Sequence, residues 1–130
     1  MSTGHEPLVL IVEDELMIAT TLEFALQSQG YRVLGPVATV AQALRLLEAE
    51  PPDVALIDYR LATTTTEALL PLLDTLKIPV CVLTGYNHTQ LPPAYAAYAK
   101  LEKPFRLNTL LQALEQLTNA RAVSVRGSDG

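Results

Sequence analysis

The sequence predicts a single α/β domain built on a parallel β-sheet with helices on both faces. Apolar runs of strand length recur along the chain, and segments of helical length separate them. Repeated strand and helix alternation requires crossover connections, which make the strands parallel and bury both faces of the sheet. A chain of 130 residues suits one such domain. The expected strands are residues 8–12, 31–37, 54–58, 79–83 and 100–102.

Three of the intervening segments carry apolar residues at helical spacing. Turn signals separate them from the strands: Gly30 follows the first segment, Thr39 is a candidate N-cap of the second, and Pro104 follows the last strand. The spacing predicts helices that contain Ile18, Leu22, Ala25 and Leu26, then Ala43, Leu44 and Leu47, and finally Leu107, Leu110, Leu111, Leu114 and Leu117.

Two other segments predict irregular structure. In "RLATTTTEALLP" four threonines precede Pro71, so we expect the third helix to start late with Pro71 in its first turn. The paired prolines in "NHTQLPPAYAAY" predict a fourth helix that is short or irregular. We expect residues 1–6 to be an N-terminal extension, 7–118 the folded domain, and the small, polar residues 119–130 a flexible tail.

Composition restricts the classes of partner. The formal charge is −5 and the basic residues are scattered, which argues against nucleic-acid binding and favours a protein partner. No apolar run is long enough to cross a membrane and the N-terminus lacks a signal-peptide pattern, so we expect a cytoplasmic protein with no membrane contact. The single cysteine, Cys81, is expected in the core.

Polar and charged residues stand where the predicted strands end. Glu13 and Asp14 follow the first strand, Asp58 ends the third, Thr84 follows the fourth and Lys103 follows the fifth. Because the carboxyl ends of parallel strands share one crevice, we expect these five side chains to meet there.

Each residue also has an ordinary structural explanation. Asp14 could be the N-cap of a helix beginning near Glu15, where acids are favoured by about 0.3 to 1 kcal/mol each. Thr84 could be a turn residue and Lys103 a solvated surface amine. Asp58 is harder to explain in this way, because a charge that closes an apolar strand is costly to bury without a partner. The coincidence of all five favours a functional site.

Phosphoryl transfer to a carboxylate needs such a set. The oxygens of Asp14 and Asp58 suit Mg²⁺, which would offset the repulsion between neighbouring acids. Asp58 could then act as a nucleophile that carries a phosphoryl group. Lys103 and Thr84 could stabilise the charge on the transferring oxygens.

The sequence resembles the receiver domains of two-component response regulators over residues 7–118, on the motifs "VEDE", "ALIDYRL", "LTGY" and "EKPF". The resemblance implies a flavodoxin-like fold with strand order 2-1-3-4-5. It implies phosphorylation of Asp58, a Mg²⁺ site on Asp14 with Glu13 assisting through water and the Arg60 carbonyl as a further ligand, and a switch hydroxyl on Thr84. It also implies a cis bond between Lys103 and Pro104.

A narrower resemblance is to single-domain receivers of the FATGUY type, on "GYRVLGPVATVAQAL" and "PVCVLTGY". One position departs from the common receiver pattern. Many receivers have an aromatic residue three positions before the lysine, and here that residue is Lys100. We expect Tyr86, two residues after Thr84, to act as the switch side chain instead.

The resemblance implies a stand-alone receiver rather than a conventional enzyme, with chemistry limited to its own phosphorylation and dephosphorylation. A histidine kinase or histidine phosphotransfer protein would donate the phosphoryl group, and output would be docking to an unknown downstream protein. Two alternatives stay open, a phosphate sink for a shared kinase and an interaction module that docks independently of phosphate. A phosphohydrolase of the haloacid dehalogenase type is disfavoured, because it expects an aspartate where Arg60 stands.

Overall fold

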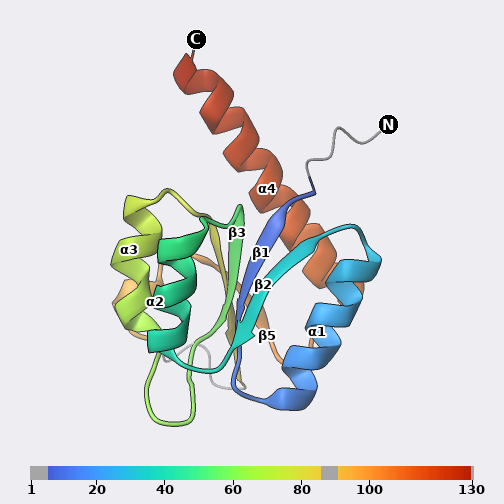
Figure 1. The fold of residues 1–130 in the computed structure, drawn as a ribbon, viewed down its shortest axis with the longest axis vertical. Coiled ribbons are helices and arrows are strands. Elements are labelled where there is room, and N and C mark those ends of the chain that lie inside the picture. Colours follow the sequence, from blue (N-terminus) through green and yellow to red (C-terminus); the bar gives the residue numbers. More distant parts are fainter. Residues whose placement is uncertain (1–5, 86–90, 130) are drawn as a thin grey trace.

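The computed structural model describes residues 6–85 and 91–129, with side chains described as far as residue 119. Its centre is a five-stranded parallel sheet in the order β2-β1-β3-β4-β5, which confirms the predicted fold class and strand order (Figure 1). The strands are β1 (Leu8–Val12), β2 (Arg32–Val37), β3 (Val54–Asp58), β4 (Val80–Thr84) and β5 (Ala99–Glu102).

Helices cover both faces of the sheet, α1 and α4 on one and α2 and α3 on the other (Figure 1). Successive residues of a strand point to opposite faces. Accordingly Leu10 of β1 packs with α2 and α3, and Ile11 packs with α1 and α4. The helices are α1 (Leu16–Ser28), α2 (Val40–Ala49), α3 (Leu70–Thr75) and α4 (Leu107–Asp129), with 3-10 turns η1 (Glu67–Leu69) and η3 (Pro93–Tyr95).

β1, β3 and β4 are fully buried, as expected for the inner strands of a sheet covered on both faces. Cys81 lies in β4 with no exposed surface, and burial raises the pKa of its thiol to about 12. This confirms that Cys81 is a core residue, and its thiol is held in the protonated, weakly reactive form.

Local sequence signals set several element boundaries. Gly30 has φ +90° and ends α1 as a Schellman motif, in which the Tyr31 N–H donates to the Leu26 carbonyl at 3.0 Å. Thr39 caps α2 by accepting the Gln42 N–H at 3.1 Å. Pro71 lies in the first turn of α3, directly after η1, so the third helix does start late.

An irregularity in edge strand β2 brings its backbone close to β1. Gly35 has φ +99°, and a Cβ atom there would lie 2.9 Å from the Ile11 carbonyl oxygen. The register of β1 against β2 shifts between Leu10 and Val12 as a result. Beyond the shift, the Val37 carbonyl accepts the Glu13 N–H at 2.9 Å, so β2 fixes the backbone that leaves β1.

The two ends of the helical layer bear on two sequence interpretations. The N-cap of α1 is Glu15, so Asp14 does not take the capping position that the sequence also allows, and the Glu13 side chain accepts the Glu15 N–H at 3.1 Å. The last helix continues to Asp129 through residues 119–126, which contain no glycine or proline, and the flexibility of residues 119–130 stays a prediction.

The segment between β4 and β5 is irregular, as the paired prolines predict. In its described part, residues 91–98, the regular element is the 3-10 turn η3. The bond between Lys103 and Pro104 is cis, as the resemblance implies. Among the described residues, no helix combines the length and the apolar character that a membrane span requires.

Candidate functional site

Four of the expected site residues stand at the carboxyl edge of the sheet. Glu13 directly follows β1, Asp58 and Thr84 are the last residues of β3 and β4, and Lys103 directly follows β5. Strand pairing places Asp58 beside Leu83 and Thr84 beside Glu102, so these ends lie next to one another. The fold therefore delivers the residues to one edge, as the sequence predicts.

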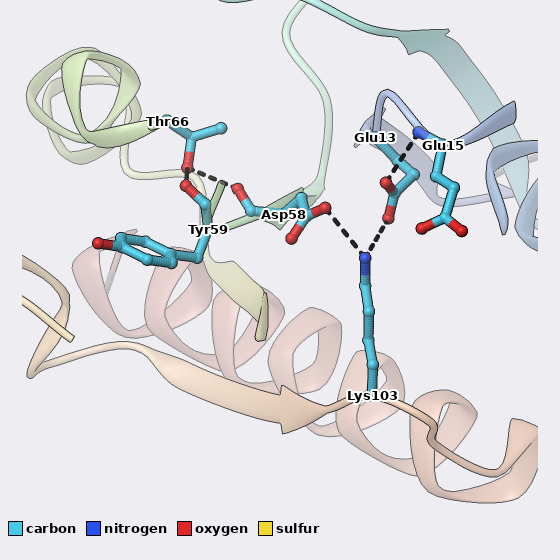
Figure 2. Close-up of polar contacts among 6 residues, drawn as sticks. All are labelled: Glu13, Glu15, Asp58, Tyr59, Thr66 and Lys103. Atoms are coloured by element: carbon cyan, nitrogen blue, oxygen red, sulfur yellow. Dashed lines mark hydrogen bonds and ion pairs between the residues drawn. The ribbon is translucent and has the colours of Figure 1, made fainter. Parts of the chain in front are cut away.

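The Lys103 ammonium joins two of the carboxylates. Its Nζ donates to Glu13 Oε1 at 2.8 Å and to Asp58 Oδ2 at 3.0 Å (Figure 2). The lysine backbone is fixed as well, since its N–H donates to the Thr84 carbonyl at 2.7 Å. The amine is not a solvated surface group, because only 20% of the Lys103 side chain is exposed.

Glu13 is the most enclosed acid of the site. It is 2% exposed and both of its carboxylate oxygens are already bonded, Oε1 to Lys103 and Oε2 to the Glu15 N–H. Asp14 differs, because it is half-buried and its side chain bonds to no residue in the described part of the chain. Of these two acids, Asp14 has its carboxylate available for another ligand.

The electrostatics of Asp58 and Lys103 reflect their burial. Desolvation raises the pKa of Asp58 to about 6, and repulsion from Glu13 adds to this against the lowering effect of Lys103. For Lys103, burial alone would lower the pKa, but the bonds and charges of Glu13 and Asp58 outweigh it and raise the pKa. Lys103 therefore stays charged at neutral pH.

Carboxylate oxygens of Glu13, Asp14 and Asp58 gather within 4.8 Å of one another. Hard oxygen donors at this spacing suit Mg²⁺, which is commonly held by one or two carboxylates with water and phosphate oxygens in its remaining positions. The Asp14 carboxylate has no hydrogen bond within the described chain, so it fits direct ligation best, with Asp58 as the second carboxylate. Glu13 fits a supporting position.

Thr84, the last residue of β4, stands at the same edge of the sheet. Thr84 is 1% exposed, and its Oγ1 makes no hydrogen bond to any described group. A buried hydroxyl left unpaired costs about 1 to 3 kcal/mol, which is unusual outside functional sites. The exposed Gly85 follows it, and no described atom outside its chain neighbours lies within 4 Å of where its Cβ would be.

The structure leaves two of the expected roles untested. The Arg60 side chain is exposed, with its guanidinium carbon 5.8 Å from the centre of the Tyr59 ring. The expected ligand is its backbone carbonyl, and that role stays a prediction. Tyr86, the expected switch side chain, lies outside the described residues.

An apolar groove opens beside the site between α1 and the segment after β5. Its volume is about 540 Å³, and Lys103 and Gly85 are among the residues that line it. The most exposed large apolar side chains of the described chain, Leu16, Met17 and Phe24, all belong to α1. The groove is also lined by Glu15, Met17, Ile18, Thr21, Leu22, Pro104 and Phe105.

Sequence reasoning missed Thr66. This residue is fully buried, and its hydroxyl donates to the Asp58 carbonyl oxygen at 2.7 Å (Figure 2). Its oxygen also lies 3.0 Å from the hydroxyl of Tyr95, which is itself fully buried. The run of four threonines carries no signal that distinguishes Thr66 from its exposed neighbours.

Known relatives match on both sequence and structure. PdtaR, a transcriptional regulatory protein of Mycobacterium tuberculosis, is 30% identical over 111 residues, which are 82% of this chain and 54% of that protein. The phyllosphere-induced regulator PhyR of Methylorubrum extorquens is 35% identical over 81 residues, or 60% and 30% of the two chains. The solution structure of SdrG from Sphingomonas melonis superposes with a TM-score of 0.76 at 31% identity, covering 90% of this chain and 98% of that one.

The chain thus spans about half of PdtaR and less of PhyR, so the match concerns one domain of those proteins. The narrower FATGUY assignment stays a prediction. The sequence model of the response regulator receiver domain family matches residues 9–115. These residues run from β1 into α4 and include the carboxyl ends of all five strands. On that match the chain belongs to the response regulator receiver domain family, the signal-receiving domain of two-component systems.

Proposed function

We propose that this receiver accepts a phosphoryl group on Asp58, with Mg²⁺ as cofactor, from a histidine kinase or histidine phosphotransfer protein. The observation that carries the proposal is the Lys103 ammonium held between Glu13 and Asp58 beside the carboxylate of Asp14. A cation and three acids at one sheet edge match the charges that phosphoryl transfer to a carboxylate must balance.

The chemistry begins at Asp58 Oδ1, the oxygen that Lys103 does not hold. It attacks the phosphorus, a bond between Oδ1 and phosphorus forms, and the bond from phosphorus to the donor's imidazole nitrogen breaks. The imidazole leaves with the electron pair of that bond. Lys103 holds Oδ2 at 3.0 Å and orients the carboxylate for attack.

The other residues manage charge on the phosphoryl oxygens. Asp14 and Asp58 would hold Mg²⁺ with Glu13 and the Arg60 carbonyl assisting, and when bound the ion neutralises charge on those oxygens. Lys103 supplies a second positive charge. The Thr84 hydroxyl has no described partner, so it is available to donate to a phosphoryl oxygen once the aspartyl phosphate exists.

The apolar groove supports a protein donor. Its lining includes Lys103 and Gly85 at the site, and also Met17, which is 81% exposed. Exposed apolar side chains beside a polar site commonly mark protein docking. We therefore propose that the protein that donates the phosphoryl group docks on α1. We also propose that the receiver acts in the cytoplasm, where kinases use ATP.

The test is incorporation of phosphate from acetyl phosphate, measured by mass. We expect one phosphoryl group on the parent protein with Mg²⁺ present, and none on Asp58→Asn. The matched control is Asp74→Asn, which removes a carboxylate that bonds the exposed Tyr98 hydroxyl away from the site. No incorporation into the parent from acetyl phosphate or from any kinase would refute the proposal.

An interaction module that ignores phosphate is the second candidate. Lys100 occupies the position of the common switch aromatic, and its amine bonds the carbonyls of Ala96 and Tyr98 instead. Partner capture that is equal for the parent and for Asp58→Asn would favour this candidate. Two roles begin with the same phosphoryl transfer, signalling by docking and draining phosphate from a shared kinase. A downstream protein that binds only the phosphorylated form would identify signalling.

A further inference from the structure

A chain of buried hydroxyls connects the backbone of Asp58 to η3. The Thr66 Oγ1 lies 2.7 Å from the Asp58 carbonyl oxygen and 3.0 Å from the Tyr95 hydroxyl. Both side chains have no exposed surface. Tyr95 is the last residue of η3, so two segments 29 residues apart meet at this bond.

Counting donors fixes the direction of the chain. A threonine hydroxyl has one proton, and the short contact to the Asp58 carbonyl uses it, since a carbonyl can only accept. The proton between Thr66 and Tyr95 must therefore come from the Tyr95 hydroxyl. The order is Tyr95 to Thr66 to Asp58, an arrangement in which each bond polarises the next.

The ring of Tyr95 is held as firmly as its hydroxyl. It packs edge-on against Tyr59, with ring centres 5.2 Å apart and planes at 89°. Tyr59 directly follows Asp58, and its N–H donates to the Leu83 carbonyl at 2.8 Å. Burial raises the pKa of Tyr95, which keeps its hydroxyl protonated as a donor. The Tyr95 ring thus contacts the residue that follows Asp58, and its hydroxyl contacts the residue that bonds the Asp58 carbonyl.

Thr66 also fixes the loop between Asp58 and η1. Its N–H donates to the Tyr59 carbonyl at 3.1 Å, and its own carbonyl accepts the Leu69 N–H at 2.9 Å. A shift of the Asp58 backbone would therefore move Thr66. That movement would be passed to Tyr95 through the buried hydrogen bond between the two hydroxyls. Lys100 cannot provide this route, because its amine is directed to backbone carbonyls of residues 96 and 98.

We propose that Thr66 is a positioning residue for Asp58, and that its bond to Tyr95 transmits the phosphorylation state of Asp58 to η3. This inference rests on the proposed function. In this inference Tyr95 couples Asp58 to η3 without an aromatic residue at position 100. The surface that changes on phosphorylation is η3 and the residues that follow it.

The test follows the backbone amides of Ala96 and Tyr98 by NMR, before and after adding Mg²⁺ and acetyl phosphate. Both N–H groups donate within this segment, to Pro93 at 3.0 Å and to Tyr95 at 3.2 Å. We expect their resonances to shift in the parent. Thr66→Val and Tyr95→Phe each remove a hydroxyl with little change in shape, and should reduce the shift by about two- to tenfold, the equilibrium factor of one net hydrogen bond.

Two controls separate coupling from damage to the fold. Thr66→Ser keeps the hydroxyl and should restore the shift, and Tyr98→Phe removes a hydroxyl from the same segment that bonds only Asp74 and should leave it unchanged. Phosphate incorporation is measured by mass in each sample. Two results would overturn this inference alone. One is phosphate incorporation into the parent with no shift of the Ala96 and Tyr98 amide resonances, and the other is an equal shift in Thr66→Val, Tyr95→Phe and the parent. Absence of incorporation in the parent would overturn it together with the proposed function.

Discussion

Lys103 is ion-paired with Asp58 in the structure, its Nζ 3.0 Å from Oδ2. The same nitrogen is 2.8 Å from Glu13 Oε1, so one ammonium forms ion pairs with two carboxylates that are almost completely buried. The site is therefore preassembled, with its cation in place before any phosphoryl group arrives. This arrangement makes the acids dependent on Lys103, and that dependence can be measured.

Lys103→Met should lower the free energy of unfolding by about 3 to 5 kcal/mol at neutral pH in metal-free buffer, because it leaves buried acids without a cation. Urea denaturation measures this loss. Lys100→Met is the matched control, since that amine bonds only backbone carbonyls, and it should cost less than about 1 kcal/mol. Equal losses in the two variants would contradict the prediction.

The loss in Lys103→Met should shrink as the pH falls from about 7 to about 5. The pKa of Asp58 is already about 6 in the fold, above its usual 3.8, and without Lys103 it should rise further. A carboxyl with a raised folded-state pKa destabilises the folded protein fully above that pKa, and the destabilisation falls as the pH drops from there toward the unfolded-state pKa. Denaturation of the variant and the parent across this pH range checks the sign, and a loss that grows on acidification would refute it.

Mg²⁺ should raise the melting temperature, because a ligand that binds only the folded state stabilises it. The gain is about 2.7 kcal/mol when free Mg²⁺ exceeds its dissociation constant by about 100-fold. For a chain of this size that corresponds to roughly 8 to 12 °C. Asp14→Asn should remove most of the gain, and Asp74→Asn should keep it. A flat response of the parent to millimolar Mg²⁺ would count against the metal site.

Gly35→Ala should destabilise the protein more than Gly30→Ala. Both glycines have positive φ, so each substitution carries a backbone cost of about 1 to 2 kcal/mol. Only at Gly35 would the new Cβ also meet backbone, 2.9 Å from the Ile11 oxygen, whereas Gly30 has open space. Urea denaturation of both variants isolates the cost of the close approach. An equal loss in the two would show that β2 can move away from β1.

Met17→Asp should slow phosphotransfer from a phosphorylated kinase by at least about tenfold, the effect of losing about 1.4 kcal/mol at a docking surface. Transfer from acetyl phosphate should be unchanged, because a small donor needs no docking surface. Leu76→Asp, at an exposed apolar residue after α3, is the control and should leave both rates unchanged. Slower transfer from acetyl phosphate would mean that the substitution disturbs the site itself.

The strand ends were predictable from the sequence because they combine two strong signals. An apolar run shows where a strand lies, and the charged residue that closes it then falls at the shared carboxyl edge. Asp58 and Lys103 are 45 residues apart and still meet by this rule. The irregular segment before β5 was predictable for a comparably local reason, the paired prolines.

Thr66 could not be predicted in the same way. It is buried where it meets Tyr95, which belongs to the segment between β4 and β5, and no local pattern encodes a contact across 29 residues. The N-cap of α1 was also open in the sequence, because Asp14 has a good capping side chain. The cap proves to be Glu15, whose N–H donates to Glu13, and Glu13 is in turn bonded to Lys103 from a segment 90 residues away.

The interruption of β2 at Gly35 has a consequence for self-association. Edge strands expose unpaired backbone groups that can join another chain, and proteins guard against this with proline, bulges or short edges. β2 carries a register shift and Pro36, which has no N–H to offer, and the opposite edge, β5, has only four residues. Neither edge therefore offers a long, regular template for strand addition, and recognition by other molecules is left to the helical faces.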